Sequence, residues 1–239
     1  MSEAVESGEM NAGAASPAPR VKVWDPIVRI GHWVIVIGVL TAYFTGDEVP
    51  MVHLWAGYSV GAALIIRVIW GFVGSRHARF SSFVTGPGAV WRYVTGLFNG
   101  QAKRSIGHNP AGAAMTLALL LALTGVTLSG VALQAVEDGT GPLAGVMASA
   151  SQTQASEPSA TSIEAQPRAY GEEREEAEDH GELAEGGGEG AEELYETLHS
   201  VFVYLLLALA AVHVVGVLVS SFAHKENLPR AMVTGRKRP

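Results

Sequence analysis

A long apolar stretch near the C-terminus, residues 194–222, most tightly constrains what this chain can fold into. Its middle is long enough to cross a bilayer, whose hydrocarbon core needs about 20 apolar residues in a helix, yet it carries His199 and His213. The two histidines are 14 residues apart, so on a helix they leave nearly the same face, about 21 Å apart along the axis. One face of this predicted membrane helix therefore offers an imidazole toward each side of the membrane.

The composition indicates a membrane protein without cysteine chemistry. Hydrophobic residues make up 48% of the 239-residue chain, and much of the acid behind the net charge of −7 is concentrated in one segment. The chain has no cysteine, which excludes disulfides, thiolate-bound iron–sulfur clusters and covalent haem attachment. A metal site must therefore use histidine, methionine or carboxylate ligands. The first 20 residues are small and acidic with no basic start, so we expect a disordered tail and no cleaved signal peptide.

Three further apolar segments complete a predicted all-α bundle of four transmembrane helices. They cover residues 27–44, residues 51–72 and a stretch from Asn109 to about residue 133. Asp25 and Asn109 are placed to cap helices, and Pro26 suits a first turn. We expect five regions, namely a disordered cytoplasmic tail (1–24), three membrane helices (25–135), an acidic low-complexity periplasmic insert (136–193), the fourth helix (194–225) and a basic cytoplasmic tail (226–239).

The distribution of lysine and arginine predicts how this bundle is oriented in the membrane. Basic residues flank the first helix, fill the loop between the second and third helices and crowd the C-terminal tail, whereas the loop after the first helix holds Asp47 and Glu48 and no base. The positive-inside rule therefore predicts an up-down bundle with both termini in the cytoplasm and the acidic insert outside. The insert is either a solvated spacer or an acidic segment that attracts a basic partner protein.

Four of the eight histidines, His32, His53, His199 and His213, fall within the predicted membrane helices. An ionisable residue there is costly and marks a functional site by default, although a single histidine can simply hydrogen-bond to a neighbouring helix. By depth they pair as His53 with His199 near the outer end and His32 with His213 near the inner end. A zinc site would need three or four clustered ligands, whereas two facing imidazoles suit an iron porphyrin. We therefore predict an outer and an inner haem iron, each held by one pair.

Other residues share these faces. Arg67 lies 14 residues after His53, and Arg29 one turn before His32, so both approach the level of the inner pair. They either neutralise the propionates of the inner haem or are anchors that extend to the membrane surface. No cation is evident for the outer haem. Gly57 and Gly61 follow His53 by one and two turns, which allows either a close helix contact or a porphyrin edge against the backbone.

These motifs resemble the bacterial cytochrome b561 and nickel–iron hydrogenase b-type cytochrome family. The similarity covers residue 21 to the C-terminus except the insert, and it rests on residues 23–33 (VWDPIVRIGHW), 53–58 (HLWAGY), 67–74, 79–83, 107–112, 198–199, 213, 224–228 and 234–238. The resemblance implies a four-helix bacterial inner-membrane protein with two non-covalent b haems, whose ligands His32, His53, His199 and His213 match one for one. The long acidic insert and the N-terminal tail depart from the family pattern.

Two imidazoles on each iron leave no position for oxygen or substrate, so we expect outer-sphere electron transfer. Each ligating histidine should donate its other ring N–H to a backbone carbonyl or hydroxyl. The favoured function is a dihaem cytochrome that carries electrons between a periplasmic redox protein and membrane quinone. His108 and Asn109 are candidate quinone-binding groups, although Asn109 also suits a helix cap.

Two alternatives stay open. One is a haem-bearing membrane anchor of a larger complex, such as a hydrogenase or dehydrogenase. The other is a non-redox membrane protein whose histidines bind protons or a metal, against which the near absence of intramembrane carboxylates argues. Quinone oxidoreductase activity and a homodimer are left open, and we expect no nucleic-acid partner.

Overall fold

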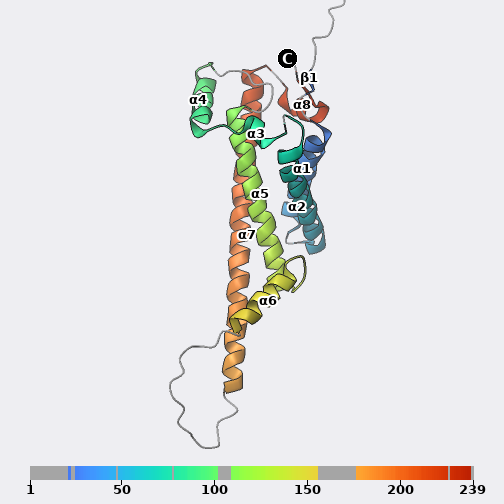
Figure 1. Ribbon diagram of the computed structural model, residues 1–239, viewed down its shortest axis with the longest axis vertical. Helices are drawn as coiled ribbons and strands as arrows, with labels where there is room; N and C mark the ends of the chain where they lie inside the picture. Colours follow the sequence, from blue (N-terminus) through green and yellow to red (C-terminus); the bar gives the residue numbers. More distant parts are fainter. Residues whose placement is uncertain are drawn as a thin grey trace, which may run out of the picture.

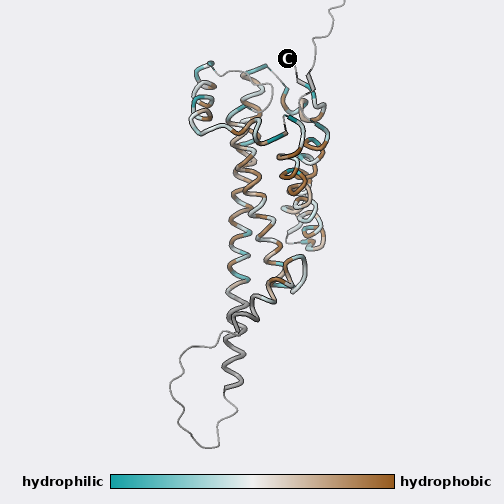
Figure 2. The backbone as a smooth tube through the Cα atoms, viewed as in Figure 1, coloured by the Kyte–Doolittle hydropathy of each residue, from teal (hydrophilic) through white to brown (hydrophobic). Residues whose placement is uncertain are grey.

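The computed structural model describes residues 21–22, 25–46, 48–76, 78–101, 109–155, 176–225 and 227–237. Within these residues, four helical segments are long and apolar enough to cross a membrane (Figures 1 and 2): α1 (Pro26–Thr45), α2 (Pro50–Val73), α5 (Pro110–Glu137) and the Gly190–Ala223 part of α7 (Glu176–Ala223). Large apolar side chains such as Ile30, Ile66 and Phe222 are exposed on these helices, as expected for surfaces that face lipid. The predicted bundle of four helices that are long and apolar enough to span a membrane is confirmed.

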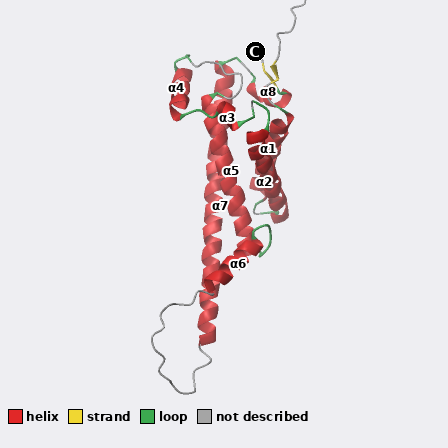
Figure 3. Ribbon diagram, viewed as in Figure 1, coloured by secondary structure: helices red, strands yellow, loops and turns green. Residues whose placement is uncertain are grey.

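The four helices alternate in direction along the bundle (Figure 1). Helix α1 packs against α2, α2 against α5, and α5 against α7. The short antiparallel pair of β1 (Val21–Lys22) and β2 (Arg236–Lys237) holds both ends of the described chain at one end of the bundle. The shorter helices cap the two ends (Figure 3): α3 (Phe80–Phe83), α4 (Pro87–Phe98) and α8 (Leu228–Thr234) at the end that carries the strands, and α6 (Ala144–Ala155) at the other.

Side-chain caps and prolines determine where the helices begin. Asp25 Oδ1 accepts a hydrogen bond of 3.0 Å from Val28 N at the start of α1. Asn109 Oδ1 accepts one of 2.7 Å from Gly112 N at the start of α5. Each cap satisfies one of the backbone N–H groups that a helix start leaves without a partner. The predicted caps at Asp25 and Asn109 are therefore confirmed.

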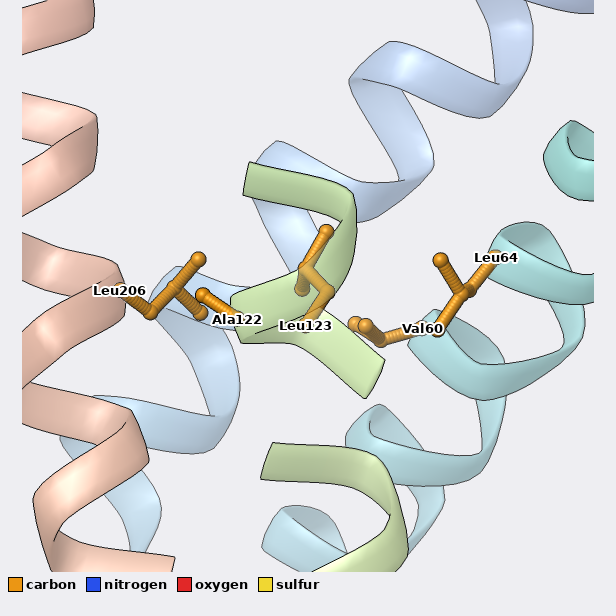
Figure 4. Packing of buried hydrophobic residues seen from close by; sticks show 5 residues of the cluster. All are labelled: Val60, Leu64, Ala122, Leu123 and Leu206. Atoms are coloured by element: carbon orange, nitrogen blue, oxygen red, sulfur yellow. The ribbon is translucent and has the colours of Figure 1, made fainter. Parts of the chain in front are cut away.

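The helices pack through a small apolar cluster and through close backbone contacts. A Cβ atom on Gly125 would lie 2.4 Å from Phe202 Cδ1, and one on Gly38 would lie 2.6 Å from Val60 Cγ2. Glycine therefore allows α5 to approach α7, and α1 to approach α2, more closely than any side chain would. The central cluster joins α2, α5 and α7 (Figure 4) and consists of Val60, Leu64, Ala122, Leu123 and Leu206.

The structure differs from the sequence-based expectation outside the membrane helices. Residues 73–108 were expected to form a polar loop, but α3 and α4 lie within them, and α8 lies within the predicted basic tail. Apart from the turn at residues 138–143, the described parts of the predicted insert are also helical, because α5 extends to Glu137, α6 follows, and α7 already begins at Glu176. Alanine and glutamate favour helix, and extending an existing helix avoids the cost of nucleation. Residues 1–20, 23–24, Asp47, 102–108 (with His108) and 156–175 lie outside the described residues.

The carboxylate of Asp25 connects the start of α1 to the end of α2. Its Oδ2 accepts hydrogen bonds from Trp70 Nε1 at 2.9 Å and from Ser75 Oγ at 2.5 Å, while Oδ1 caps α1. Burial raises the pKa of Asp25, but the hydrogen bonds from Ser75, Trp70 and the backbone outweigh it, so the pKa lies below its ordinary value. The sequence predicted the cap alone, because nothing in it places Trp70 beside residue 25.

Replacing Asp25 with Asn should weaken this connection while keeping an oxygen for the cap. We expect a loss of about 1.5–3 kcal/mol in the free energy of unfolding, the range for hydrogen bonds to a charged group. Since folding depresses the pKa of the carboxylate, the stabilisation is present at neutral pH and is lost as the pH falls below about 4. Thermal unfolding of both proteins in detergent should show a difference at neutral pH that vanishes in acid. Equal stability at neutral pH would contradict this role.

Candidate functional site

Helix α7 presents two histidines on one face. The helix is continuous from Glu176 to Ala223, so His199 and His213 are separated by about 21 Å along its axis. The other two membrane histidines lie near the start of α2 (His53) and early in α1 (His32). Each level of the bundle therefore combines one histidine from α7 with one from the α1–α2 pair.

The outer pair faces each other across the bundle. The ring centroids of His53 and His199 are 6.1 Å apart, and the ring planes are inclined by 68°. A metal–nitrogen bond of about 2 Å on each side puts the centres of two imidazoles on one metal roughly 6 Å apart. The pair therefore has the separation that a shared axial metal ion requires.

The second nitrogen of each outer histidine is turned toward the backbone. His53 Nδ1 lies 2.9 Å from Ala42 O, and His199 Nδ1 lies 3.2 Å from both Val126 O and Ser129 Oγ. A carbonyl oxygen only accepts, so each Nδ1 carries the proton and donates it, which leaves each Nε2 with its lone pair. This is the partner expected for a metal-ligating histidine.

A cavity of about 280 Å³ adjoins the outer pair. Apolar side chains from all four membrane helices line most of it, together with His53, His199 and Gly57. A Cβ atom on Gly57 would meet nothing within 4 Å, whereas one on Gly61 would lie 3.1 Å from Thr127 Cγ2. Gly61 therefore serves a close helix contact with α5, whereas the space beside Gly57 is open; a porphyrin edge against Gly57 stays a prediction.

The inner pair joins α1 and α7. His32 lies early in α1, and His213 lies on the same face of α7 as His199, about 21 Å further along the helix; their pairing at one level stays a prediction. His32 Nδ1 is buried and has no hydrogen-bonding partner among the described residues. A buried ring nitrogen without a partner is costly, so this histidine suits a site completed by a ligand. Within the described part of the chain, no three histidine, aspartate or glutamate side chains cluster as a metal site, so the donors come in pairs.

Both arginines singled out from the sequence have protein partners. Arg67 is buried, its Nη1 donates to Ala78 O at 3.4 Å, and its guanidinium carbon lies 5.3 Å from the centre of the Phe80 ring. Arg29 donates from Nε to Met232 O at 3.2 Å and from Nη2 to Val233 O. These carbonyls belong to the last turn of α8, so Arg29 caps that helix. Their predicted contact with haem propionates stays a prediction.

The sequence missed several groups at the site. The acceptors Ala42 O and Val126 O are backbone atoms, and no sequence pattern marks them. Tyr58 and Gln134 line the outer cavity and are hydrogen-bonded to each other; Tyr58 belongs to the HLWAGY motif, but its partner on α5 is visible only in three dimensions. The candidate quinone residue His108 lies outside the described residues, and Asn109 caps α5.

Comparison with known proteins agrees with this arrangement. The family model of prokaryotic cytochrome b561 matches residues 23–235. The chain is 33% identical over 118 residues to the probable Ni/Fe-hydrogenase B-type cytochrome subunit of Rhizobium leguminosarum bv. viciae, which covers 38% of this chain and 49% of that protein. It is 31% identical over 150 residues to the corresponding subunit of Rhodobacter capsulatus, which covers 51% of this chain and 57% of that protein.

A third relative is the probable Ni/Fe-hydrogenase 1 B-type cytochrome subunit of Escherichia coli K12, 29% identical over 142 residues, or 46% of this chain and 59% of that protein. The chain spans about half the length of the curated relatives that it matches. No solved structure matches. Because the family match runs through all four membrane helices and includes all four membrane histidines, the chain belongs to the prokaryotic cytochrome b561 family.

Proposed function

We propose that this protein is a dihaem b-type cytochrome of the bacterial cytoplasmic membrane, which transfers electrons between a periplasmic redox partner and the quinone pool. Membership of the b561 family implies haem b. The observation that best supports haem binding by histidine pairs is the outer pair. Its rings are 6.1 Å apart, and both Nδ1 atoms are turned to backbone carbonyls. For the inner level we propose the second pair, His32 on α1 and His213 on α7, where the buried Nδ1 of His32 has no partner among the described residues.

When bound, haem b supplies reversible one-electron oxidation and reduction at its iron. His53 with His199, and His32 with His213, would each hold one haem iron, and these residues would keep oxygen and water away from the metal. The carbonyls of Ala42 and Val126 hold the proton on Nδ1 and aim Nε2 inward. Helix α7 fixes the spacing of the two levels at about 21 Å.

Arg67 and Arg29 remain our candidates for the propionates of the inner haem. An arginine has five N–H donors, and the contacts of Arg67 with Ala78 O and of Arg29 with the end of α8 use only some of them. Both guanidinium groups lie at the end of the bundle where the charge pattern predicts the cytoplasm.

A second candidate function is a haem-bearing membrane anchor of a larger complex. The curated relatives are named as cytochrome subunits of Ni/Fe hydrogenases, which favours a hydrogenase as the partner. In either case we propose that both termini face the cytoplasm and that the outer pair and the acidic segment face the periplasm, where the partner would dock. Co-purification of a hydrogenase with the tagged protein would support the anchor role, and isolation of the cytochrome alone with quinone-linked activity would support the first function.

Haem stoichiometry tests the pairing. The His213→Ala variant should lose the inner haem, so the pyridine haemochrome assay and the reduced-minus-oxidised spectrum should show two haems per chain falling to one. His224→Ala is the matched control, because His224 lies beyond the end of α7 and contacts Tyr93 Oη at 3.3 Å. A full haem complement in His213→Ala would contradict the pairing.

The space beside Gly57 gives a second test. Gly57→Leu should fill the outer cavity and reduce occupancy of the outer haem at least tenfold, because the added side chain competes for the volume beside His53. The chain should still fold, since leucine is a better helix former than glycine by roughly 0.5–1 kcal/mol. Gly57→Ala is the control, because its Cβ meets nothing within 4 Å. Two full haems in the leucine variant would show that the cavity is not the outer haem site.

Substitutions of Arg67 test whether its charge lies beside the propionates of the inner haem. Replacing Arg67 with Leu removes a positive charge that favours the reduced iron, so the midpoint potential of the inner haem should fall by roughly 50–100 mV. Arg67→Lys keeps the charge and should stay close to the wild-type potential, even though it disturbs the contact with Phe80. An unchanged redox titration in the leucine variant would remove Arg67 from the site.

A further inference from the structure

A polar pair closes the outer cavity where the rest of its lining is mostly apolar. Tyr58 Oη donates a hydrogen bond of 2.6 Å to Gln134 Oε1, and Gln134 Nε2 donates one of 3.3 Å to Thr140 Oγ1. Tyr58 and Gln134 line the same cavity as His53 and His199. The pair therefore places polar groups in the cavity that the two outer histidines share.

The turn after α5 holds this pair in place. Gly141 has a φ of +90°, which favours glycine. A Cβ atom there would lie 2.6 Å from Gln134 Oε1 and 3.3 Å from Tyr58 Oη, so the backbone of the turn lies directly against the pair. Thr140, in the same turn, does not line the cavity but accepts the hydrogen bond from Gln134 Nε2 and so helps to hold that amide.

The cavity offers neutral donors and no charge. Among the described residues that line it, none is lysine, arginine, aspartate or glutamate. A haem held between His53 and His199 brings two carboxylates that need hydrogen-bond donors, and a carboxylate bound by neutral donors keeps its negative charge in the site. Tyr58 and Gln134 bring a hydroxyl and a side-chain amide together at one place in this lining, where they are hydrogen-bonded to each other.

We propose that Tyr58 and Gln134, supported by Thr140, bind the carboxylate groups of the outer haem through neutral hydrogen bonds. This assignment rests on the proposed function. It extends that function to the carboxylates of the outer haem, for which the sequence indicates no cation. Tyr58 turns its hydroxyl from Gln134 to the carboxylate, and the Gln134 amide offers its N–H groups. The outer site is thereby built without cations, in contrast to the two arginines near the inner pair.

The contrast has a measurable consequence. Neutral donors stabilise a carboxylate less than an arginine does, so protonation of the outer carboxylates should be coupled to the outer midpoint potential within an accessible pH range. Removing a donor favours the protonated form. When the midpoint potential of the outer haem is plotted against pH, the curve bends where these carboxylates take up protons. This bend should therefore move to higher pH by about one unit or more, which is a tenfold change in proton affinity.

The experiment is a redox titration across pH of the purified full-length protein and of the variants Tyr58→Phe, Gln134→Leu and Gln134→Glu. The outer haem is identified as the component that is missing in His53→Ala. We expect two haems in Tyr58→Phe and Gln134→Leu, with the outer bend moved to higher pH and the inner potential unchanged. Gln134→Glu places a carboxylate against carboxylates and should give the largest shift or loss of the outer haem.

Tyr204→Phe is the matched control, because Tyr204 lines the same cavity but does not belong to the Tyr58–Gln134 pair. It should leave the outer bend where it is in the wild type. An outer pH profile that is unchanged in all three variants of the pair, with two haems present, would overturn this assignment while leaving the dihaem function intact. If His53→Ala keeps both haems, the proposed function itself fails, so the two failures are distinguishable.

Discussion

The structure depends on four half-buried histidines inside a lipid-facing bundle. A histidine at this depth has two ring nitrogens, and each needs a partner because water is absent from the hydrocarbon region. At the outer level the protein satisfies one nitrogen of each ring through Ala42 O and Val126 O. The remaining nitrogens face a shared space, and a metal ion between them would satisfy both at once.

The helix packing follows from this requirement. The tight contacts run in a chain from α1 to α2, α5 and α7, and they are made by glycines such as Gly38 and Gly125 and by the cluster around Leu123. The histidine pairs, in contrast, connect α7 with α1 and α2. Helix α5 packs between α2 and α7, and its own Ser129 and Gln134 lie at the outer histidines and their cavity.

Periodicity and depth were enough to predict the four membrane helices, and the spacing of His199 and His213 predicted which residues share a level. The caps at Asp25 and Asn109 were also predictable, since each needs only local sequence. The connection from Asp25 to Trp70 and Ser75 was not, because it depends on the crossing of α1 and α2. Arg29 shows the same limit: its place near His32 was predicted, whereas its bonds to the last turn of α8 join residues about 200 positions apart.

Paramagnetic resonance of the oxidised protein tests the central claim most directly, because it reports the axial ligands of each iron. Two imidazoles per iron predict two low-spin ferric signals of comparable intensity, with the near-infrared magnetic circular dichroism of bis-histidine ligation, and no high-spin signal in the intact protein. A dominant high-spin ferric signal, or a single low-spin species that accounts for all the iron, would contradict the account of two facing histidine pairs.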